Sequence, residues 1–195
     1  MKTKILTTNS LLLGWDEMSI LGDMLTDEES TYCLGDHVNI ILLHSQLNME
    51  KQTKIFEDAP EGQRKIILST NIAETSVTIN DVKYVIDSGK CNISKYNKIS
   101  KACNFDKEWI SKSSACQRKG RAGRVQDGIC WRMYSSKKFK EFNEFMQPEI
   151  KRLPLEEIVL NIKSLHLDAT KNIPNFMNYL VEPPELIMVH TALVS

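Results

Sequence analysis

Short apolar stretches rich in β-branched residues recur along the first two thirds of the chain. Their apolar residues follow one another directly instead of alternating with polar ones, which is typical of strands buried on both faces of a parallel sheet. The predicted strands are "VNIILL" (38–43), "KIILST" (65–70), "VKYVIDS" (82–88) and "GICWRMYS" (128–135).

Helical segments separate these strands. "NMEKQTKIFED" lies between the first two, with Asn48 as a plausible N-cap, and the short "AETSV" lies between the second and third. Alternation of strands and helices predicts an α/β fold with a parallel sheet, in which ligands bind at the carboxyl ends of the strands.

Two regions depart from this alternation. Residues 91–108 have the pattern of neither a helix nor a buried strand, and we expect a projecting hairpin or a long loop. After Pro148, "LPLEEIVLNIKSLHL" has apolar residues at helical spacing. This helix either begins a second, small helical unit or packs back on the α/β domain, and periodicity alone does not decide between the two.

The charge of the chain is unevenly distributed. The 195 residues have no net formal charge, but residues 88–140 contain 14 Lys+Arg against 3 Asp+Glu, whereas the segments on both sides are acidic. Such a basic block indicates a polyanion partner. The alternative is a solvated basic surface, and charge alone favours neither.

The composition is that of an ordinary soluble globular protein. No apolar run is long enough to span a membrane and Met1 does not begin a signal peptide, so we expect an intracellular protein, in the cytoplasm or nucleus, without a membrane partner. The cysteines are five in number, widely spaced and without a CxxC pair, which argues against a disulfide framework and a zinc site.

"QRKGRAGR" (117–124) places four cations and two glycines in eight residues. If the stretch is helical, Gln117, Arg121 and Arg124 fall at i, i+4 and i+7 on one face. Guanidinium groups suit bidentate contact with phosphate, and the glycines would allow a backbone or a nucleotide to approach closely. The alternative is a flexible basic loop.

"STNIAETSVTI" (69–79) directly follows a predicted strand. Ser69, Thr70 and Asn71 are short donors that can contact phosphate or ribose without reading a base sequence. Taken alone, such a cluster is more often a turn or a helix cap.

Together these two stretches resemble motifs VI and V of superfamily 2 helicases, in the version of the DEAH/RNA helicase A group. "LLLGWDEMSIL" (11–21) is similar to the motif IV region, and "PEIKRLPLEEIVLNIKSLHL" (148–167) is similar to the entry into the winged-helix domain. The resemblance implies a RecA-like helicase C-terminal domain at 1–147, with helices on both faces of its sheet, and the truncated start of a winged helix at 148–195.

The resemblance also implies roles for individual residues. Gln117 would orient the attacking water, while Arg121 and Arg124 would contact the γ-phosphate of ATP as arginine fingers. Phe56 would stack on the adenine, unless it is a core residue of its helix, and Asn80 or Asp81 would contact the ribose. The hairpin at 90–112 would wedge against the strand being separated. The residues that match the nucleic-acid contacts of the group are Gly14, His44, Ser45, Ser69, Thr70, Asn71 and Thr75.

The chain also departs from the family pattern. It contains neither GxxxxGK[ST] nor a DEAH motif, so the phosphate cradle and the ligands of Mg²⁺ are expected on a first RecA-like domain that is missing from it. Met1 to Ser10 match the expected first strand poorly. We therefore expect the second motor domain of an ATP-dependent RNA helicase, which binds RNA or DNA and is inactive alone. The alternative is a truncated, non-catalytic module that binds RNA or a partner. A metabolic α/β enzyme is disfavoured because scattered histidines form no catalytic constellation.

Overall fold

The computed structural model describes residues 7–11, 14–44, 47–58, 60, 62–75, 78–97, 102–164 and 172–194. Contacts divide the chain into two units. The first comprises Met1–Asn92 and Lys107–Met146, and the second comprises Ile93–Asp106 and Gln147–Ser195. Each unit is described by itself.

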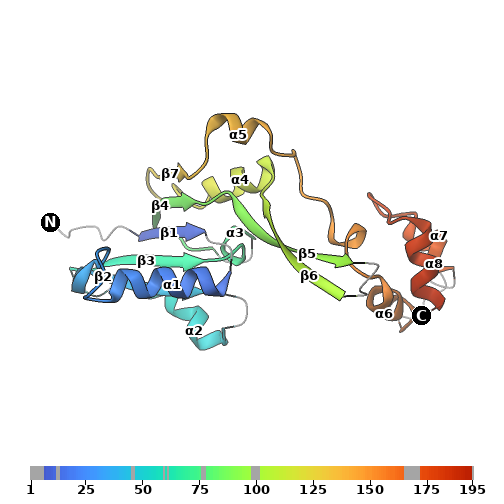
Figure 1. Cartoon of the computed structure of the whole chain (residues 1–195), viewed down its shortest axis with the longest axis horizontal. Helices are drawn as coiled ribbons and strands as arrows, with labels where there is room; N and C mark the ends of the chain where they lie inside the picture. Colours follow the sequence, from blue (N-terminus) through green and yellow to red (C-terminus); the bar gives the residue numbers. More distant parts are fainter. Residues whose placement is uncertain are drawn as a thin grey trace. The chain divides into compact units, whose positions relative to one another are not determined.

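A five-stranded parallel sheet forms the centre of the first unit, with the strand order β2-β3-β1-β4-β7 (Figure 1). The α/β class and the four predicted strands are confirmed. The strands are β1 (Thr7–Leu11), β2 (Val38–Leu43), β3 (Arg64–Ser69), β4 (Val82–Asp87) and β7 (Ile129–Arg132).

The N-terminal stretch contains strand β1, which the pattern of apolar runs did not predict and whose sequence matches the family strand poorly. It is the central strand of the sheet and pairs with β3 on one side and β4 on the other. Its sequence, "TTNSL", is mostly polar, so an apolar run could not reveal it. Backbone pairing with two neighbours, which depends little on side-chain polarity, holds it in place.

Helices cover both faces of this sheet. Gly22 in α1 (Trp15–Thr26) lies against Leu42 and Leu68, which are paired in register on β2 and β3. The next residues toward the N-terminus, Ile41 and Ile67, are also paired and belong to a core cluster on the opposite face. Residues adjacent in a strand point to opposite faces, so uninterrupted apolar runs are what a sheet covered on both faces requires.

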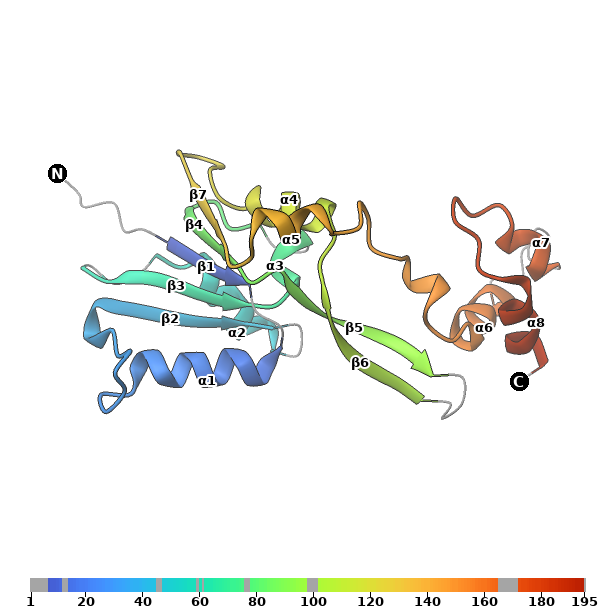
Figure 2. The same cartoon turned by 45° about the horizontal axis from the view of Figure 1, so that its top comes forward.

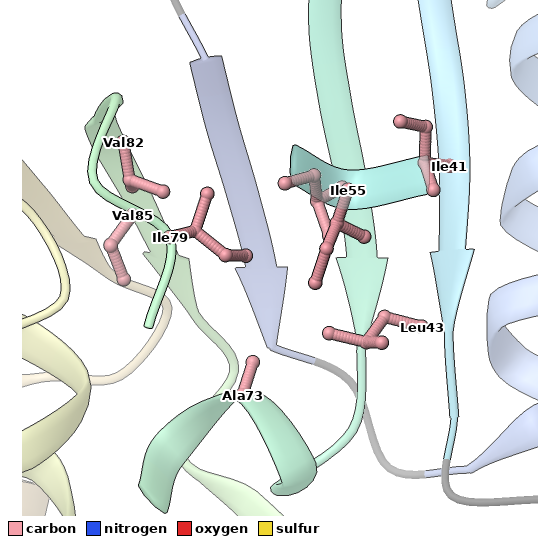
Figure 3. Packing of buried hydrophobic residues seen from close by; sticks show 8 residues of the cluster. Ile41, Leu43, Ile55, Ala73, Ile79, Val82 and Val85 are labelled. Carbon is pink, nitrogen blue, oxygen red and sulfur yellow. The ribbon is translucent and has the colours of Figure 1, made fainter. Parts of the chain in front are cut away.

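The cluster on that opposite face is formed by the sheet, a short turn and a short helix (Figure 3). Ile55 enters it from the 3₁₀ turn η2 (Lys54–Phe56), and Ala73 from α3 (Ile72–Thr75). The helix predicted after Asn48 begins at Met49 as α2 (Met49–Thr53) and passes directly into η2. Ile79, Val82 and Val85 complete the cluster beside Ile41, Leu43 and Ile67.

Two further helices of the first unit begin at serine caps. The Ser111 hydroxyl accepts a hydrogen bond from the Ser114 N–H at the start of α4 (Lys112–Lys119). The Ser135 hydroxyl accepts one from Lys138 at the start of α5 (Ser136–Lys140). Because the cap satisfies an otherwise unpaired N–H, each helix has a defined first residue. The residues packed beside these helices include Trp109, Ile110, Ala115, Tyr134, Phe139 and Phe142.

The hairpin expected in the basic region is present as β5 (Lys90–Asn97) and β6 (Ala102–Trp109). These strands form a two-stranded sheet separate from the parallel one (Figure 2). At its base, the Ile110 N–H donates to the Gly89 carbonyl, and Lys107 forms a 2.6 Å salt bridge with Glu17 of α1. The alternative of a long loop is therefore wrong.

The second unit has its own small core. The helix expected after Pro148 forms, and its apolar positions pack with those of two later helices of the same unit. Arg152 ties this segment to the hairpin, since its Nη1 donates to the Ser94 carbonyl and its own carbonyl accepts from Tyr96. The assignment of 148–195 to a winged helix stays a prediction. The elements are η3 (Glu149–Lys151), α6 (Glu156–Ser164), α7 (Ile173–Met177) and α8 (Leu186–Val194).

Two further features concern the whole described chain. None of the helices within the described ranges has both the length and the apolar character needed to cross a bilayer. All five cysteines lie in these ranges and none is disulfide-bonded. Burial raises the pKa of the Cys130 thiol, and the charge of Asp87 adds to that effect, so this thiol is less reactive than an exposed one.

Candidate functional site

The stretch "QRKGRAGR" is helical only in its first part. α4 ends at Lys119 and Gly120 caps it, so Gln117 lies in the last turn whereas Arg121 and Arg124 lie beyond the helix. The expected helical face through all three residues is therefore wrong. Arg121 nevertheless folds back on the helix, because its N–H donates to the Arg118 carbonyl and its Nε approaches the Gln117 carbonyl at 3.5 Å.

The two glycines of this stretch have different roles. Gly120 has an ordinary helical φ of −67°, whereas Gly123 has a φ of +78°, a conformation that favours glycine. The Gly123 N–H lies 3.4 Å from the Val82 carbonyl at the start of β4, and a Cβ on Gly128 would lie only 2.4 Å from the Gly123 nitrogen. In this structure, the backbone of Val82 in β4 and that of Gly128 approach Gly123 closely.

This loop, residues 120–124, carries Arg121 and Arg124, and we call it the arginine loop. Partial burial lowers the pKa of Arg121, the charge of Arg124 lowers it further, and Glu74 acts in the opposite direction. Two guanidinium groups that repel one another favour an anion placed between them. Arg124 is exposed and forms no salt bridge with any residue that the structure describes. The arrangement suits the binding of a phosphate group.

Arg118, for which the sequence predicted no role, forms the buried ion pairs that hold the end of α4 in place. It is fully buried, with Nε 2.9 Å from a Glu74 carboxylate oxygen and Nη1 3.0 Å from one of Asp87. Burial lowers the pKa of Arg118, but the charges of Asp87 and Glu74 outweigh that effect and the net shift is upward. Arg118 therefore joins α4 both to α3, inside the "AETSV" stretch, and to the end of β4. Nothing in the local sequence distinguishes it from the three exposed or half-buried cations beside it.

The candidate contacts of the nucleotide base and ribose lie on two segments of the first unit. Phe56, at the end of η2, has 61% of its surface exposed, so the alternative that it is a core residue is wrong. Asn80 is exposed and Asp81 is half-buried at the start of β4. Sequence reasoning also missed Lys65, which is buried and whose Nζ lies 3.1 Å from the Asp81 carboxylate.

The candidate nucleic-acid contacts lie at the carboxyl ends of strands. His44 follows β2, with its ring 6.0 Å from that of Trp15, and Gly14 precedes α1. The Thr70 N–H donates to the Leu43 carbonyl and so joins the ends of β2 and β3. Ser45 and the side chain of Thr75 lie outside the described residues.

The short donors after β3 differ in accessibility. Ser69 and Thr70 are buried at 0% and 5% exposure, whereas Asn71 is exposed. Of the three, Asn71 is therefore the side chain best placed to meet a phosphate. Trp15 is a further aromatic surface here, 40% exposed against His44, and its position directly after Gly14 was the only sequence signal for it.

The candidates thus fall at opposite ends of the parallel strands. The nucleic-acid candidates lie at the carboxyl ends, as expected, but Asp81 and the anchor of the arginine loop at Val82 lie at the amino end of β4. Lys65 stands near the start of β3 and Ser69 at its end, about 13 Å apart at the rise of an extended strand. Asp81 and the Val82 anchor therefore do not lie at the carboxyl ends, where the sequence predicted ligands to bind.

A comparison with protein families decides what this architecture is. The model of the helicase conserved C-terminal domain matches residues 17–126, more than half of the chain. The chain belongs to this family. The matched region of this helicase C-terminal domain includes most of α1, the nucleotide candidates, the hairpin and the arginine loop.

Similar proteins and solved structures show to which group of helicases this domain belongs. The helicase domain is 44% identical over 173 residues to a bovine ATP-dependent DNA/RNA helicase DHX36, and 40% identical over 182 residues to the human ATP-dependent RNA helicase DHX29. These alignments cover 89% and 93% of the chain. The E. coli DEAH/RHA helicase HrpB superposes over 96% of the chain with a TM-score of 0.80 and 25% identity. The predicted membership in the DEAH/RNA helicase A group and the RecA-like fold are confirmed.

The domain matches only part of each of these proteins. It spans 17% of the bovine relative, 13% of the human one and 23% of the HrpB chain. The relatives are therefore several times longer than this chain of 195 residues.

Proposed function

We propose that this chain is the second motor domain of an ATP-dependent RNA helicase, and that it supplies Arg121 and Arg124 to ATP held by a P-loop domain outside residues 1–195. We call this chain joined to such a P-loop domain the complete motor. The P-loop domain is either the one encoded with this chain or that of the bovine relative, in which this chain replaces the matching segment. The names of the relatives, which are ATP-dependent helicases, support the use of ATP.

The observation that carries the proposal is the arginine loop. It presents two guanidinium groups, of which Arg124 lies close enough for its charge to lower the pKa of Arg121. The Gly123–Val82 hydrogen bond holds the loop at the same end of β4 as Asp81. In phosphoryl transfer, positioned cations stabilise the charge that develops on the transferring group. Gln117, exposed one turn before Arg121, is the residue of this chain proposed to orient the attacking water.

The proposed ATP site is divided between two domains. Bound ATP with Mg²⁺ supplies the phosphoanhydride bond that is cleaved, and the phosphate cradle and metal ligands belong to the P-loop domain. The donor set on this chain fits the remainder of the nucleotide, because Phe56 offers an exposed ring for the base and the arginine loop offers cations for the phosphates. Asn80 and Asp81 directly precede Val82, to which the arginine loop is hydrogen-bonded, so either residue could contact the ribose.

The nucleic acid is proposed to bind at the other end of the strands. Asn71 and His44 would contact the phosphate backbone there, together with Gly14, Ser45, Ser69, Thr70 and Thr75 as the family match implies. Backbone contacts position a strand without reading its sequence, as a motor that moves along many sequences requires. Preference for RNA would come from the 2′-hydroxyl. The hairpin, with Phe105 76% exposed, is proposed to separate the strands.

Comparison of the chain alone with the complete motor tests this function. We expect no ATP hydrolysis above background by the chain alone, and hydrolysis stimulated by single-stranded RNA in the complete motor. Equal hydrolysis by the chain alone would contradict the divided site. RNA binding without any stimulation of hydrolysis in the complete motor would instead establish the non-catalytic binding module.

A further inference from the structure

We propose that Lys65 is a positioning residue for the nucleotide base, because it fixes both segments that carry the candidate base and ribose contacts. The inference rests on the proposed function and deepens it. The proposed role of Lys65 is indirect, through Phe56 and Asp81, and assigns it no contact with the nucleotide itself.

The contacts of Lys65 carry the inference. Its side chain is buried, and its Nζ donates to the Ile55 carbonyl at 2.9 Å and to the Glu57 carbonyl at 3.0 Å. The same Nζ lies 3.1 Å from the Asp81 carboxylate. An ammonium group has three N–H donors, and here all three have an acceptor. One buried cation therefore holds the backbone on both sides of Phe56 and, at the same time, the side chain of Asp81.

The hydrophobic core holds the same two segments, the one that carries Phe56 and the one that carries Asn80 and Asp81. Ile55 and Ile79 are both buried in one cluster of the sheet (Figure 3). Next to these anchors in the sequence, Phe56 is 61% exposed and Asn80 is exposed. Each segment thus has a buried residue followed by one that faces solvent, and Lys65 adds the polar connection between the segments that the apolar contacts lack.

Burial of the lysine explains why this connection is rigid. A buried charge is tolerated only where acceptors surround it, so the two carbonyls and the carboxylate must keep their places around Nζ. A stacking ring contributes to binding only when its plane is correctly placed, and its supporting residues determine that. The arginine loop depends on other contacts, through Gly123 and Arg118, so loss of Lys65 should leave the phosphate contacts in place.

Inhibition of the complete motor by ADP and by pyrophosphate distinguishes placement of the base from contact with the phosphates. ADP carries the base and ribose, whereas pyrophosphate carries neither, and both are tested as inhibitors of RNA-stimulated ATP hydrolysis. For Lys65→Met we expect the inhibition constant of ADP to rise about tenfold, with that of pyrophosphate and kcat at saturating ATP within about twofold. Unchanged inhibition by ADP, or an equal rise for ADP and pyrophosphate, would overturn the inference.

A double-mutant cycle tests whether Lys65 acts through Phe56. The ADP penalties of Phe56→Ala and Lys65→Met should combine to less than their product, because the ring that Lys65 positions is already absent. Fully multiplicative penalties would contradict the route through Phe56. Lys140→Met, a change of an exposed lysine at the end of α5, is the matched control and should leave both inhibition constants unchanged.

If Lys65→Met does not fold, the conservative variant Lys65→Arg tests the positioning role of Lys65. Lys65→Arg keeps the buried positive charge, but a planar guanidinium cannot direct donors to three acceptors around a single nitrogen. We expect weaker inhibition by ADP only, and wild-type values for both inhibitors would overturn the inference. The proposed function is judged separately from Arg124→Ala, so a normal result for Lys65 with a large loss for Arg124 rejects this inference alone.

Discussion

The guanidinium of Arg118 and the carboxylate of Asp87 lie 3.0 Å apart, and neither side chain is exposed to solvent. The two residues stand 31 positions apart, one in the motif VI helix and one at the end of β4. Glu74 of α3 binds the same guanidinium. The arginine loop begins two residues after Arg118 and is therefore attached directly to this buried ion pair.

Arg118→Met should strongly destabilise the first unit. The substitution leaves Asp87 and Glu74 buried without their cation, a change that costs about 3–5 kcal/mol in the free energy of unfolding. All three tryptophans lie in this unit, so urea unfolding followed by tryptophan fluorescence measures it. Lys119→Met, at the exposed neighbouring position, is the control and should change the midpoint little. An unfolding midpoint for Arg118→Met equal to that of the control would show that the ion pair is dispensable.

Tyr134 gives this network a dependence on alkaline pH. Its hydroxyl donates to the Asp87 carboxylate at 2.8 Å, and burial, that hydrogen bond and the Asp87 charge together raise the pKa of Tyr134. A group with a raised folded-state pKa stabilises the protein below its unfolded pKa of about 10 and loses that contribution as pH rises toward the folded value. At pH 8, Tyr134→Phe should cost about 1.5–3 kcal/mol, the range for a hydrogen bond to a charged group.

The comparison of the two proteins across pH tests the titration itself. The difference in unfolding free energy between wild type and Tyr134→Phe should shrink from pH 9 to pH 11, because only the wild type contains this group. The lysines titrate in both proteins and cancel in the difference. A difference that is constant over this range would show that Tyr134 does not titrate with unfolding.

The two glycines of the arginine loop should respond differently to alanine. Gly123→Ala places a side chain at a φ of +78°, which costs about 1–2 kcal/mol and strains the hydrogen bond to Val82. Gly120→Ala is the matched control, because its φ is −67° and its Cβ would meet its nearest neighbours at 3.4 Å. We expect a lower unfolding midpoint and slower ATP hydrolysis for Gly123→Ala only. Equal effects of the two substitutions would argue against the loop geometry.

Asn71→Ala should weaken RNA binding without changing its sequence preference. Loss of one hydrogen bond to a phosphate, worth about 1 kcal/mol, corresponds to about a fivefold increase in Kd. Binding of the complete motor to two unrelated single-stranded RNAs, measured by fluorescence anisotropy, should show the same increase for both. Asn143→Ala, at another exposed asparagine of the first unit, provides the control. A loss for one RNA only would mean that Asn71 reads a base.

Much of the fold could be predicted because it follows from local patterns. Four strands were visible since a sheet covered on both faces requires uninterrupted apolar runs, as in residues 38–43. β1 could not be predicted in this way, because "TTNSL" is a strand through its backbone pairing with β3 and β4. The end of α4 was also missed, since the positive φ of Gly123 and its hydrogen bond to Val82 depend on a strand 41 residues earlier.

The candidate site could be predicted only where a motif names a residue directly. Arg121 and Arg124 were proposed from the resemblance, and both lie on the loop after α4. Arg118 and Lys65 were missed because their roles depend on distant partners such as Glu74 and Asp81. A sequence shows a buried lysine and an exposed one in the same way, and only tertiary packing distinguishes them.

The rate of ATP hydrolysis by the complete motor carrying Arg124→Ala tests the central claim most directly. It is measured at saturating ATP and RNA, beside Lys119→Ala, a neighbouring cation to which no phosphate contact is assigned. An arginine that stabilises the transferring phosphoryl group is worth about 10³-fold or more in kcat, so we predict a loss of that order for Arg124→Ala and little change for Lys119→Ala. An RNA-stimulated rate for Arg124→Ala equal to that of the unsubstituted motor would contradict the claim.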